Sequence, residues 1–149
     1  MKRVGFGFVL LLVLLCSGSA SAQRRFGLGA VVGQPSGFSA KYWLDGRNSL
    51  DGILGIDLGR HGGMLVNVDW VHHWADLTPV SQGKFLLGAG AGMYIGAGDK
   101  FGLGARVKGL ADYVFAPAPV NIFLEVAPTV IFDDPGIGMQ GGLGVRWFF

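Results

Sequence analysis

The sequence has little cysteine, little charge of either sign and no long apolar run. Its one cysteine, Cys16, lies near the N-terminus, so the rest of the chain cannot rely on disulfides. Charged residues make up 15% of the chain. Lys2 and Arg3 belong to the N-terminal segment, and without them the 12 basic residues fall to ten, equal to the ten acidic residues. With no basic excess, the remaining chain gives no sign of a nucleic-acid partner.

Residues 1–22 have the pattern of a cleavable signal peptide. The basic start is followed by an apolar run over residues 4–15 and by Ala20-Ser21-Ala22, a small-x-small cleavage site. A membrane-spanning helix needs roughly 20 apolar residues, so this run suits a signal peptide better than the alternative, an uncleaved anchor. Cys16 follows Leu15 rather than a small residue, so we expect it to leave with the signal peptide. The sequence thus predicts export by the general secretory route.

The mature chain, residues 23–149, is predicted to be a single all-β domain. The whole sequence contains 27 glycines, and a glycine weakens a helix by about 1 kcal/mol relative to alanine. Short apolar segments separated by Gly, Asp and Pro are typical of strands joined by tight turns, and only the connection over residues 75–83 is longer. The eight expected strands are 25–33, 37–44, 48–58, 64–74, 84–96, 101–115, 120–132 and 138–149.

Alternation along these strands indicates what surrounds them. In the segment 101–115, Phe101, Leu103 and Val107 share one face, whereas Arg106 and Lys108 share the other with several glycines. A soluble barrel would turn the glycine-rich face to water, although a soluble surface is normally well charged. A membrane barrel turns the apolar face to lipid. We therefore expect an eight-stranded antiparallel up-and-down transmembrane β-barrel, with a soluble periplasmic calycin-like ligand binder as the alternative.

The polar face carries the candidate functional residues. Four positive and five negative side chains share it, and unpaired charge inside a narrow barrel is costly, so a paired network is expected. Eight strands leave an interior just wide enough for side chains to fill. The sequence therefore predicts a salt-bridged plug and not a pore. The expected lumen charge network is Lys41, Asp51, Asp57, Asp69, Arg106, Lys108, Asp112, Glu125 and Arg146.

Within this network, the hairpin formed by 101–115 and 120–132 places Arg106 and Glu125 on the same inward face. Lys108 is an alternative partner for Glu125 because the register is open. Pro128 cannot donate a hydrogen bond to a neighbouring strand, so we expect a β-bulge at this position.

The C-terminus also favours the membrane interpretation. Leu143, Val145, Trp147 and Phe149 alternate with smaller or polar residues, and the sequence stops on Phe149. An alternating last strand with a terminal aromatic residue resembles the signal read by the outer-membrane assembly machinery. The expected partners are outer-membrane lipid, together with that machinery and periplasmic chaperones during biogenesis. Aromatic residues gather near both ends of the strands, as in the girdles of membrane barrels.

Several segments resemble a family of small bacterial outer-membrane β-barrel proteins of unassigned function. They are residues 27–37, 41–44, 67–73, 121–128 and 141–149, which together extend over nearly the whole mature chain. The resemblance implies an eight-stranded barrel in the outer membrane of a Gram-negative-type bacterium. It implies no substrate, cofactor or catalytic residue.

No residue pattern points clearly to catalysis, metal or cofactor binding. His72 and His73 are adjacent and so face opposite sides of a strand, which prevents joint chelation without a bulge. We expect His73 at the lumen end near Asp69 and His72 at the lipid interface. A lipid A-modifying outer-membrane enzyme is the other alternative, but it needs a nucleophile, a base and an orienting carboxylate in contact. No mature serine lies two residues from a histidine, which leaves only a cross-strand triad.

Overall fold

The structure is a computed structural model, which describes residues 24–57, 63–74, 79–98, 100–133 and 135–149, without the side chains of 79 and 80. The expected signal peptide and the first part of the expected loop over residues 75–83 lie outside the described residues. Among the residues described, no helix is long and apolar enough to cross a membrane.

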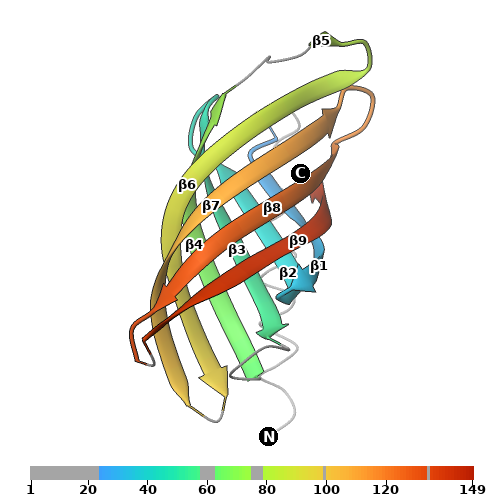
Figure 1. The fold of residues 1–149 in the computed structure, drawn as a ribbon. Coiled ribbons are helices and arrows are strands. Elements are labelled where there is room, and N and C mark those ends of the chain that lie inside the picture. Colours follow the sequence, from blue (N-terminus) through green and yellow to red (C-terminus); the bar gives the residue numbers. More distant parts are fainter. Residues whose placement is uncertain (1–23, 58–62, 75–78, 99, 134) are drawn as a thin grey trace, which may run out of the picture.

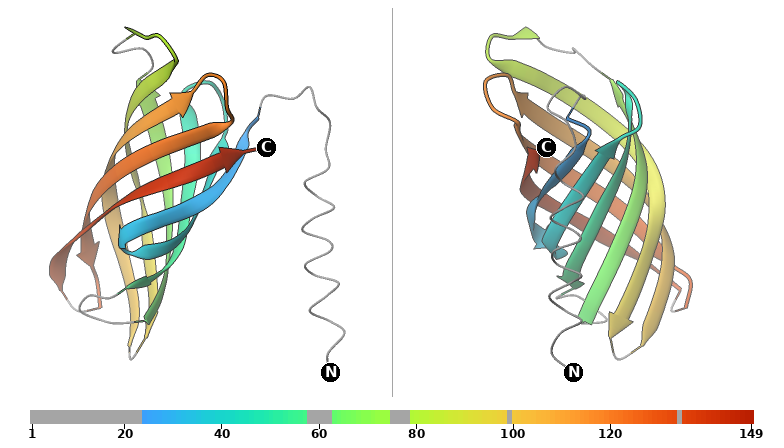
Figure 2. Two further views of the ribbon diagram at one scale, coloured as in Figure 1. Left: turned by 90° about the vertical axis from the view of Figure 1, so that its right-hand side faces the viewer. Right: turned by 180° about the vertical axis from the view of Figure 1, so that it is seen from behind.

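Eight strands form a closed antiparallel barrel, which confirms the expected all-β, eight-stranded up-and-down architecture. Each strand pairs with its neighbour in the sequence, and β1 and β9 also pair along their length (Figures 1 and 2). The ring is completed between β4 and β6. The barrel strands are β1 (Phe26–Gln34), β2 (Ser36–Trp43), β3 (Asn48–Asp57), β4 (Gly63–Trp74), β6 (Gly83–Gly98), β7 (Phe101–Phe115), β8 (Val120–Ile131) and β9 (Gly136–Phe148).

The start of β1 and the end of β9 lie together at one end of the barrel, here called the terminal mouth. The Phe149 backbone N–H donates to the Phe26 carbonyl at 2.8 Å, and the Trp43 N–H donates to the Arg25 carbonyl at the same distance. The β2–β3 and β7–β8 connections are at this end as well. The β1–β2 and β8–β9 connections are at the opposite end, here called the distal mouth (Figure 1).

Two connections differ from expectation. The sequence predicts a loop over residues 75–83, but β5 (Pro79–Val80) pairs within this stretch with Lys84 and Gly83. The turn expected over residues 34–36 contracts to Pro35 alone between β1 and β2. Gly33 makes this contraction possible, because it adopts a positive φ of 152° that side-chain-bearing residues rarely accept.

The prediction of a β-bulge at Pro128 is wrong. The backbone pairing between β7 and β8 is interrupted where Pro128 lies opposite Val107 and Ala127 lies opposite Lys108. The register of the two strands is the same before and after this interruption. On the other side, Pro128 stays in register with Met139 of β9. The missing N–H therefore removes a rung of the ladder without inserting an extra residue into either strand.

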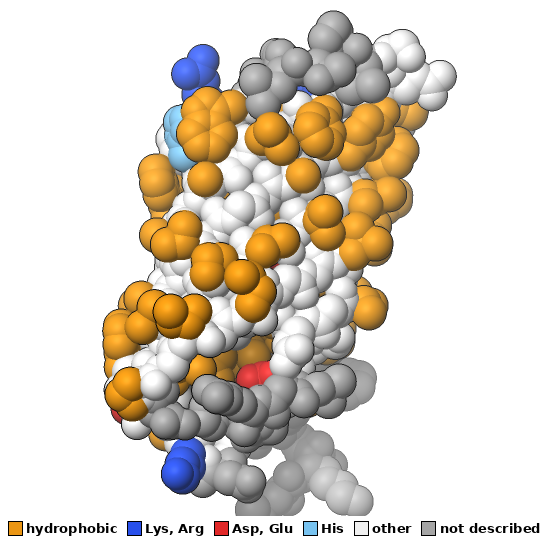
Figure 3. Space-filling view, viewed as in Figure 1, with side chains coloured by type: hydrophobic (Ala, Val, Ile, Leu, Met, Phe, Trp, Pro, Cys, Tyr) orange, Lys and Arg blue, Asp and Glu red, His pale blue; other side chains and the backbone are white. Residues whose placement is uncertain are grey.

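Many large hydrophobic side chains face outward from the barrel, whereas a smaller cluster of Val31, Ile53, Val71, Leu110 and Phe123 is buried inside. The outward-facing side chains lie along the visible wall from one end to the other, whereas Lys and Arg side chains show only near the two ends (Figure 3). Leu124 and Val126 of β8 are about half exposed, while Phe123, Glu125 and Ala127 beside them in the strand are buried. This strict alternation follows from the pleat of a strand, which turns successive side chains to opposite faces.

Glycines of the inward face make room for the few large side chains inside. The Phe148 ring packs where Gly27 has no side chain, and the Phe123 ring does the same over Gly144. A Cβ atom at Gly27 would lie 2.8 Å from the Phe148 ring. Because an eight-stranded barrel has a narrow interior, each of these large inward residues depends on a glycine beside it.

Candidate functional site

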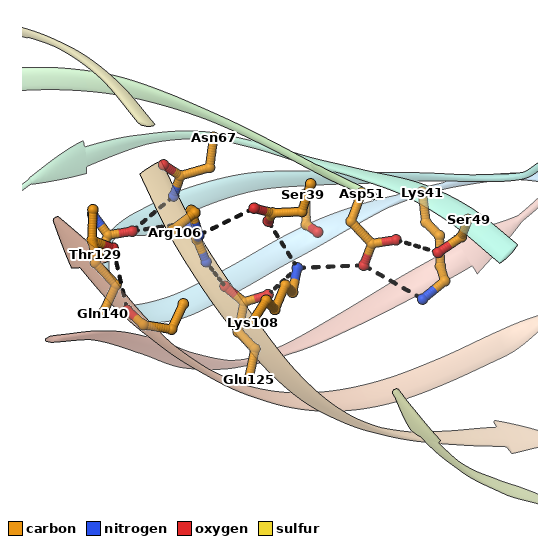
Figure 4. A network of polar contacts seen from close by, with 12 residues as sticks. Ser39, Lys41, Ser49, Asp51, Asn67, Arg106, Lys108, Glu125, Thr129 and Gln140 are labelled. Carbon is orange, nitrogen blue, oxygen red and sulfur yellow. Dashed lines mark hydrogen bonds and ion pairs between the residues drawn. The ribbon is translucent and has the colours of Figure 1, made fainter. Parts of the chain in front are cut away.

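The interior between the two mouths holds paired charged side chains from six strands. All are at most 2% exposed, and the four positive groups equal the four negative ones. Much of this arrangement can be followed in Figure 4. These residues, here called the lumen network, are Lys41, Asp51, Asp69, Arg106, Lys108, Asp112, Glu125 and Arg146.

Asp57, the ninth expected member, lies apart from the lumen network. It is the last residue of β3 and is only partly buried at the distal mouth. Its carboxylate accepts a hydrogen bond from Gln34 Nε2 at 3.3 Å. Asp57 has the same inward orientation as Asp51, is the last residue of β3, and lines the distal cavity together with Thr129 and Gln140.

Asp51 is the centre of the lumen network. Its Oδ2 atom lies 3.4 Å from Lys41 Nζ, 3.4 Å from Lys108 Nζ and 3.3 Å from Arg146 Nη2. Its Oδ1 atom accepts a hydrogen bond of 2.7 Å from the Ser49 hydroxyl. One carboxylate from β3 thereby connects cations from β2, β7 and β9, which lie around the ring of strands.

Toward the distal mouth, Glu125 and Asp69 share two cations. Lys108 Nζ lies 2.7 Å from Glu125 Oε2, whereas Arg106 Nη2 lies 3.4 Å from Glu125 Oε1. Of the two expected partners, Lys108 is thus the closer. Arg106 Nε lies 3.2 Å from Asp69 Oδ1, but the geometry is not that of a hydrogen bond, so this contact is purely ionic.

Toward the terminal mouth, the lumen network ends in Lys41, Asp112 and His73. Lys41 Nζ donates to Asp112 Oδ2 at 2.8 Å and lies 3.0 Å from His73 Nε2. His73 Nε2 is also 3.3 Å from Asp112. The structure therefore places His73 in the lumen as expected, but its carboxylate neighbour is Asp112 and not Asp69.

Neutral polar residues complete the interior and were not singled out in the sequence. Gln140 Oε1 accepts hydrogen bonds from Arg106 Nη1 at 2.8 Å and from Asn67 Nδ2 at 3.0 Å. Asn121 donates to Asp112, and the Ser39 hydroxyl accepts from Arg146. Each of these residues has the inward parity of its strand. The alternation of inward and outward positions along each strand could therefore have predicted these residues from the sequence.

Arg146 has an additional aromatic partner. Its guanidinium carbon lies 3.6 Å from the centroid of the Phe123 ring, and that ring also packs against Gly144. A cation over an aromatic face is stabilised by the ring quadrupole, more strongly where water is excluded. Phe123 thus helps to hold a charge that lies away from solvent.

Among the described residues, no serine hydroxyl is hydrogen-bonded to a histidine. The Ser49 hydroxyl is bonded to Asp51, and that of Ser36 to the Gly33 carbonyl. His72 lies on the outer face between Trp70 and Trp74, with its Nδ1 atom 2.9 Å from Asn48 Oδ1. Among these residues, the arrangement offers buried, balanced charge and no assembled nucleophile and base.

The fold and the interior together define a closed eight-stranded antiparallel barrel with a charged lumen. No model of a known protein family matches the chain, and no curated protein matches its sequence. Among solved structures, the chain is similar to the N-terminal β-barrel domain of OprF from Pseudomonas aeruginosa, with a TM-score of 0.60 and 19% identity. The match covers 85% of this chain and 98% of that domain. At this identity the likeness concerns the fold alone.

Proposed function

We propose that this chain is a small outer-membrane β-barrel protein whose lumen is plugged by side chains and whose role is structural or one of envelope interaction. The observation that carries the proposal is the inverted distribution of polarity. Every member of the lumen network is buried inside, while the outer wall is covered by hydrophobic side chains. In a soluble protein, large continuous apolar surfaces of this kind are rare. A lipid bilayer removes their exposure to water.

Aromatic side chains at both ends of the wall support the same proposal. Trp74, Trp147 and Phe149 are exposed near the terminal mouth, and Phe38 and Phe101 are exposed near the distal mouth. Amphipathic aromatic rings favour the two membrane–water interfaces and form girdles around transmembrane barrels. The distance between the two groups then marks the part of the wall that lipid covers.

The number of strands and the charge balance support the proposed plug. Eight strands enclose a space that side chains can fill, and the lumen network and its neutral partners occupy it. Buried ions that are paired on several sides are costly to separate. We therefore assign these residues the role of closing and stiffening the barrel, without transport through it.

Biogenesis of such a barrel requires partners. We propose that periplasmic chaperones carry the chain and that the barrel-assembly machinery reads the outward ridge of β9. This ridge consists of Leu143, Val145, Trp147 and Phe149, which are all exposed.

Deletion of Phe149 tests the role of this ridge. It is expected to reduce the amount of barrel in outer-membrane fractions and to leave unassembled chain in the periplasm. Phe149→Trp is the matched control, because it keeps an aromatic residue at position 149 and should assemble like the parent. An unchanged outer-membrane yield without Phe149 would contradict this assignment.

The membrane proposal is tested by fractionation and by gel migration. The chain expressed in a Gram-negative host should sediment with outer membranes and resist extraction by salt and carbonate. Unheated samples in dodecyl sulfate should migrate differently from boiled ones, because a closed membrane barrel stays folded in that detergent. A chain recovered in the soluble periplasmic fraction, with no difference in migration, would instead favour the calycin-like alternative.

A further inference from the structure

The terminal mouth contains a cavity of about 400 Å³. Trp43 of β2, Leu86 of β6, Val114 of β7 and Phe148 of β9 line it, so strands from opposite sides of the ring contribute. The cavity is therefore inside the barrel, on its axis, and not on the outer wall. Its volume falls within the range of roughly 300–1,000 Å³ that is usual for small-molecule sites.

Along β2, β7 and β9, the inward side chains change from charged to apolar at this cavity. Lys41, Asp112 and Arg146 belong to the lumen network, and the next inward residues toward the terminal mouth are Trp43, Val114 and Phe148. Apolar side chains that face only water in an open mouth do not stabilise the barrel. An apolar layer beside an aqueous opening favours an occupant with an apolar part.

The rim of the cavity is positively charged. Among the described lining residues, Arg24 and Arg25, which precede β1, and Lys84 of β6 are basic, and Asp45 supplies the carboxylate. Asp45 accepts hydrogen bonds from the backbone of its own turn and from Asn48. Among the described residues, neither Arg24 nor Lys84 forms an ion pair, so their charge is available at the opening.

The distal mouth differs in both respects. Its cavity is smaller, about 230 Å³, and is lined by Gln34, Asp57, Thr129 and Gln140 among others. Ile131, Ile137 and Met139 line it as well, and among its described lining residues the charged side chain is the carboxylate of Asp57. The two ends of the barrel are therefore chemically distinct.

We propose that the terminal mouth binds an amphipathic anion with a single apolar tail, such as a fatty carboxylate. The tail lies on Leu86, Trp43 and Phe148, and the anionic head is held by Arg24 and Lys84 at the rim. The site depends on the geometry of the barrel and not on its placement in a membrane, so it stands or falls separately from the proposed outer-membrane function.

Calorimetric titration of the full mature barrel with decanoate tests this site. The protein is folded in phosphatidylcholine vesicles, and protein-free vesicles provide the blank for partitioning. Saturable binding of one decanoate per barrel is expected, with much weaker binding of acetate and of the decyltrimethylammonium cation. Acetate binding as tight as that of decanoate would overturn the role of the tail, and equal binding of the cation would overturn the role of the rim.

Three variants locate the site. Lys84→Glu should weaken decanoate binding about tenfold, which corresponds to ~1.4 kcal/mol. Leu86→Trp should remove it by filling the cavity. Lys100→Glu makes the same charge reversal in the exposed β6–β7 connection at the distal mouth and should leave the affinity unchanged.

Each variant is first checked for the far-ultraviolet spectrum of the folded barrel. If Leu86→Trp does not fold, the comparison of Lys84→Glu with Lys100→Glu still decides. Equal affinities in these two variants would overturn the proposal.

Discussion

At the scale of single residues, the lumen network is held by carboxylates that each serve more than one cation. Glu125 contacts Lys108 at 2.7 Å and Arg106 at 3.4 Å, in surroundings from which water is excluded. Glu125→Ala leaves both cations short of a partner, and breaking a buried pair in this way typically costs about 3–5 kcal/mol. We expect a loss of this size in the free energy of unfolding, measured by urea titration of tryptophan fluorescence in lipid vesicles.

Two controls separate charge from packing in this measurement. Lys100→Ala removes an exposed charge at the distal mouth and should have little effect. Glu125→Gln keeps the shape and a hydrogen-bonding group but loses the charge, so its stability should lie between those of the parent and of Glu125→Ala. If Glu125→Ala proved as mild as Lys100→Ala, Glu125 would have to be solvated, and its place inside the barrel would be wrong.

The alternation of side chains along each strand predicts that these charged residues face the lumen. It does not predict which of them form ion pairs with each other. Lys41 and Asp112 are 71 residues apart and meet across the lumen at 2.8 Å. No alternation pattern encodes such a contact, because it depends on the diameter and stagger of the closed ring. Glu125 and Lys108, on adjacent strands of a hairpin, were within reach of sequence reasoning, since a short turn limits their register. For Asp57, alternation predicted the inward face but did not indicate that β3 ends at this residue.

At the scale of elements, strand boundaries were predictable where turns carried their usual residues. The β7 strand begins and ends where expected, between Lys100 and Ala116. The one-residue connection at Pro35 and the short strand β5 were not predicted, because local composition does not reveal how far two strands continue to pair beside a turn. The bulge expected at Pro128 is absent. Losing one backbone hydrogen bond disturbs the barrel less than a change of register, which would turn every later side chain to the wrong face.

The inward glycines lead to a prediction about packing between elements. A Cβ atom at Gly144 would overlap the Phe123 ring and lie 2.5 Å from the Ala30 carbonyl oxygen, so Gly144→Ala should destabilise the barrel by roughly 1–3 kcal/mol. At Gly52 the nearest atom, the Asn67 carbonyl oxygen, is 3.8 Å away, so Gly52→Ala should be tolerated. Urea unfolding of both variants measures the difference. Equal stabilities would show that Phe123 does not need the space at Gly144.

The stability that the β2–β3 turn contributes is predicted to depend on pH. Hydrogen bonds from the Asn48 side chain and from the Arg47 and Asn48 backbone hold the pKa of Asp45 below its usual value of about 3.9. A carboxyl with a lowered folded-state pKa adds stability above that usual value, and the contribution disappears as the pH falls through the folded-state pKa. The stability difference between the parent and Asp45→Ala should therefore shrink below about pH 4. A difference that is constant from pH 7 to pH 3 would contradict the ionic role of Asp45.

At the scale of the whole molecule, the barrel consists of three parts along its axis. The cavity of the terminal mouth is lined by apolar and basic side chains, the middle holds the lumen network beside a small hydrophobic cluster, and the cavity of the distal mouth has a mixed lining with the carboxylate of Asp57. Hydrophobic side chains cover the wall outside these parts. The two cavities are separated by side chains of the lumen network, such as Arg146 and Lys108, that are at most 1% exposed.

This separation predicts that the barrel does not conduct ions. A hydrated ion entering either mouth meets charges that are already paired, and displacing them would strand buried ions at a cost of several kcal/mol. The purified protein in planar lipid bilayers should therefore show no stable conductance steps at moderate voltage, under conditions in which a general porin inserted from the same detergent does. Insertion is verified independently by protease protection in vesicles of the same lipid, so that silence cannot be mistaken for failure to insert. Reproducible conductance steps from the inserted parent protein would mean that the lumen network opens, and would overturn the proposed plug. Conductance steps that occur only in Glu125→Ala would show that the ion pair of Glu125 and Lys108 blocks the lumen.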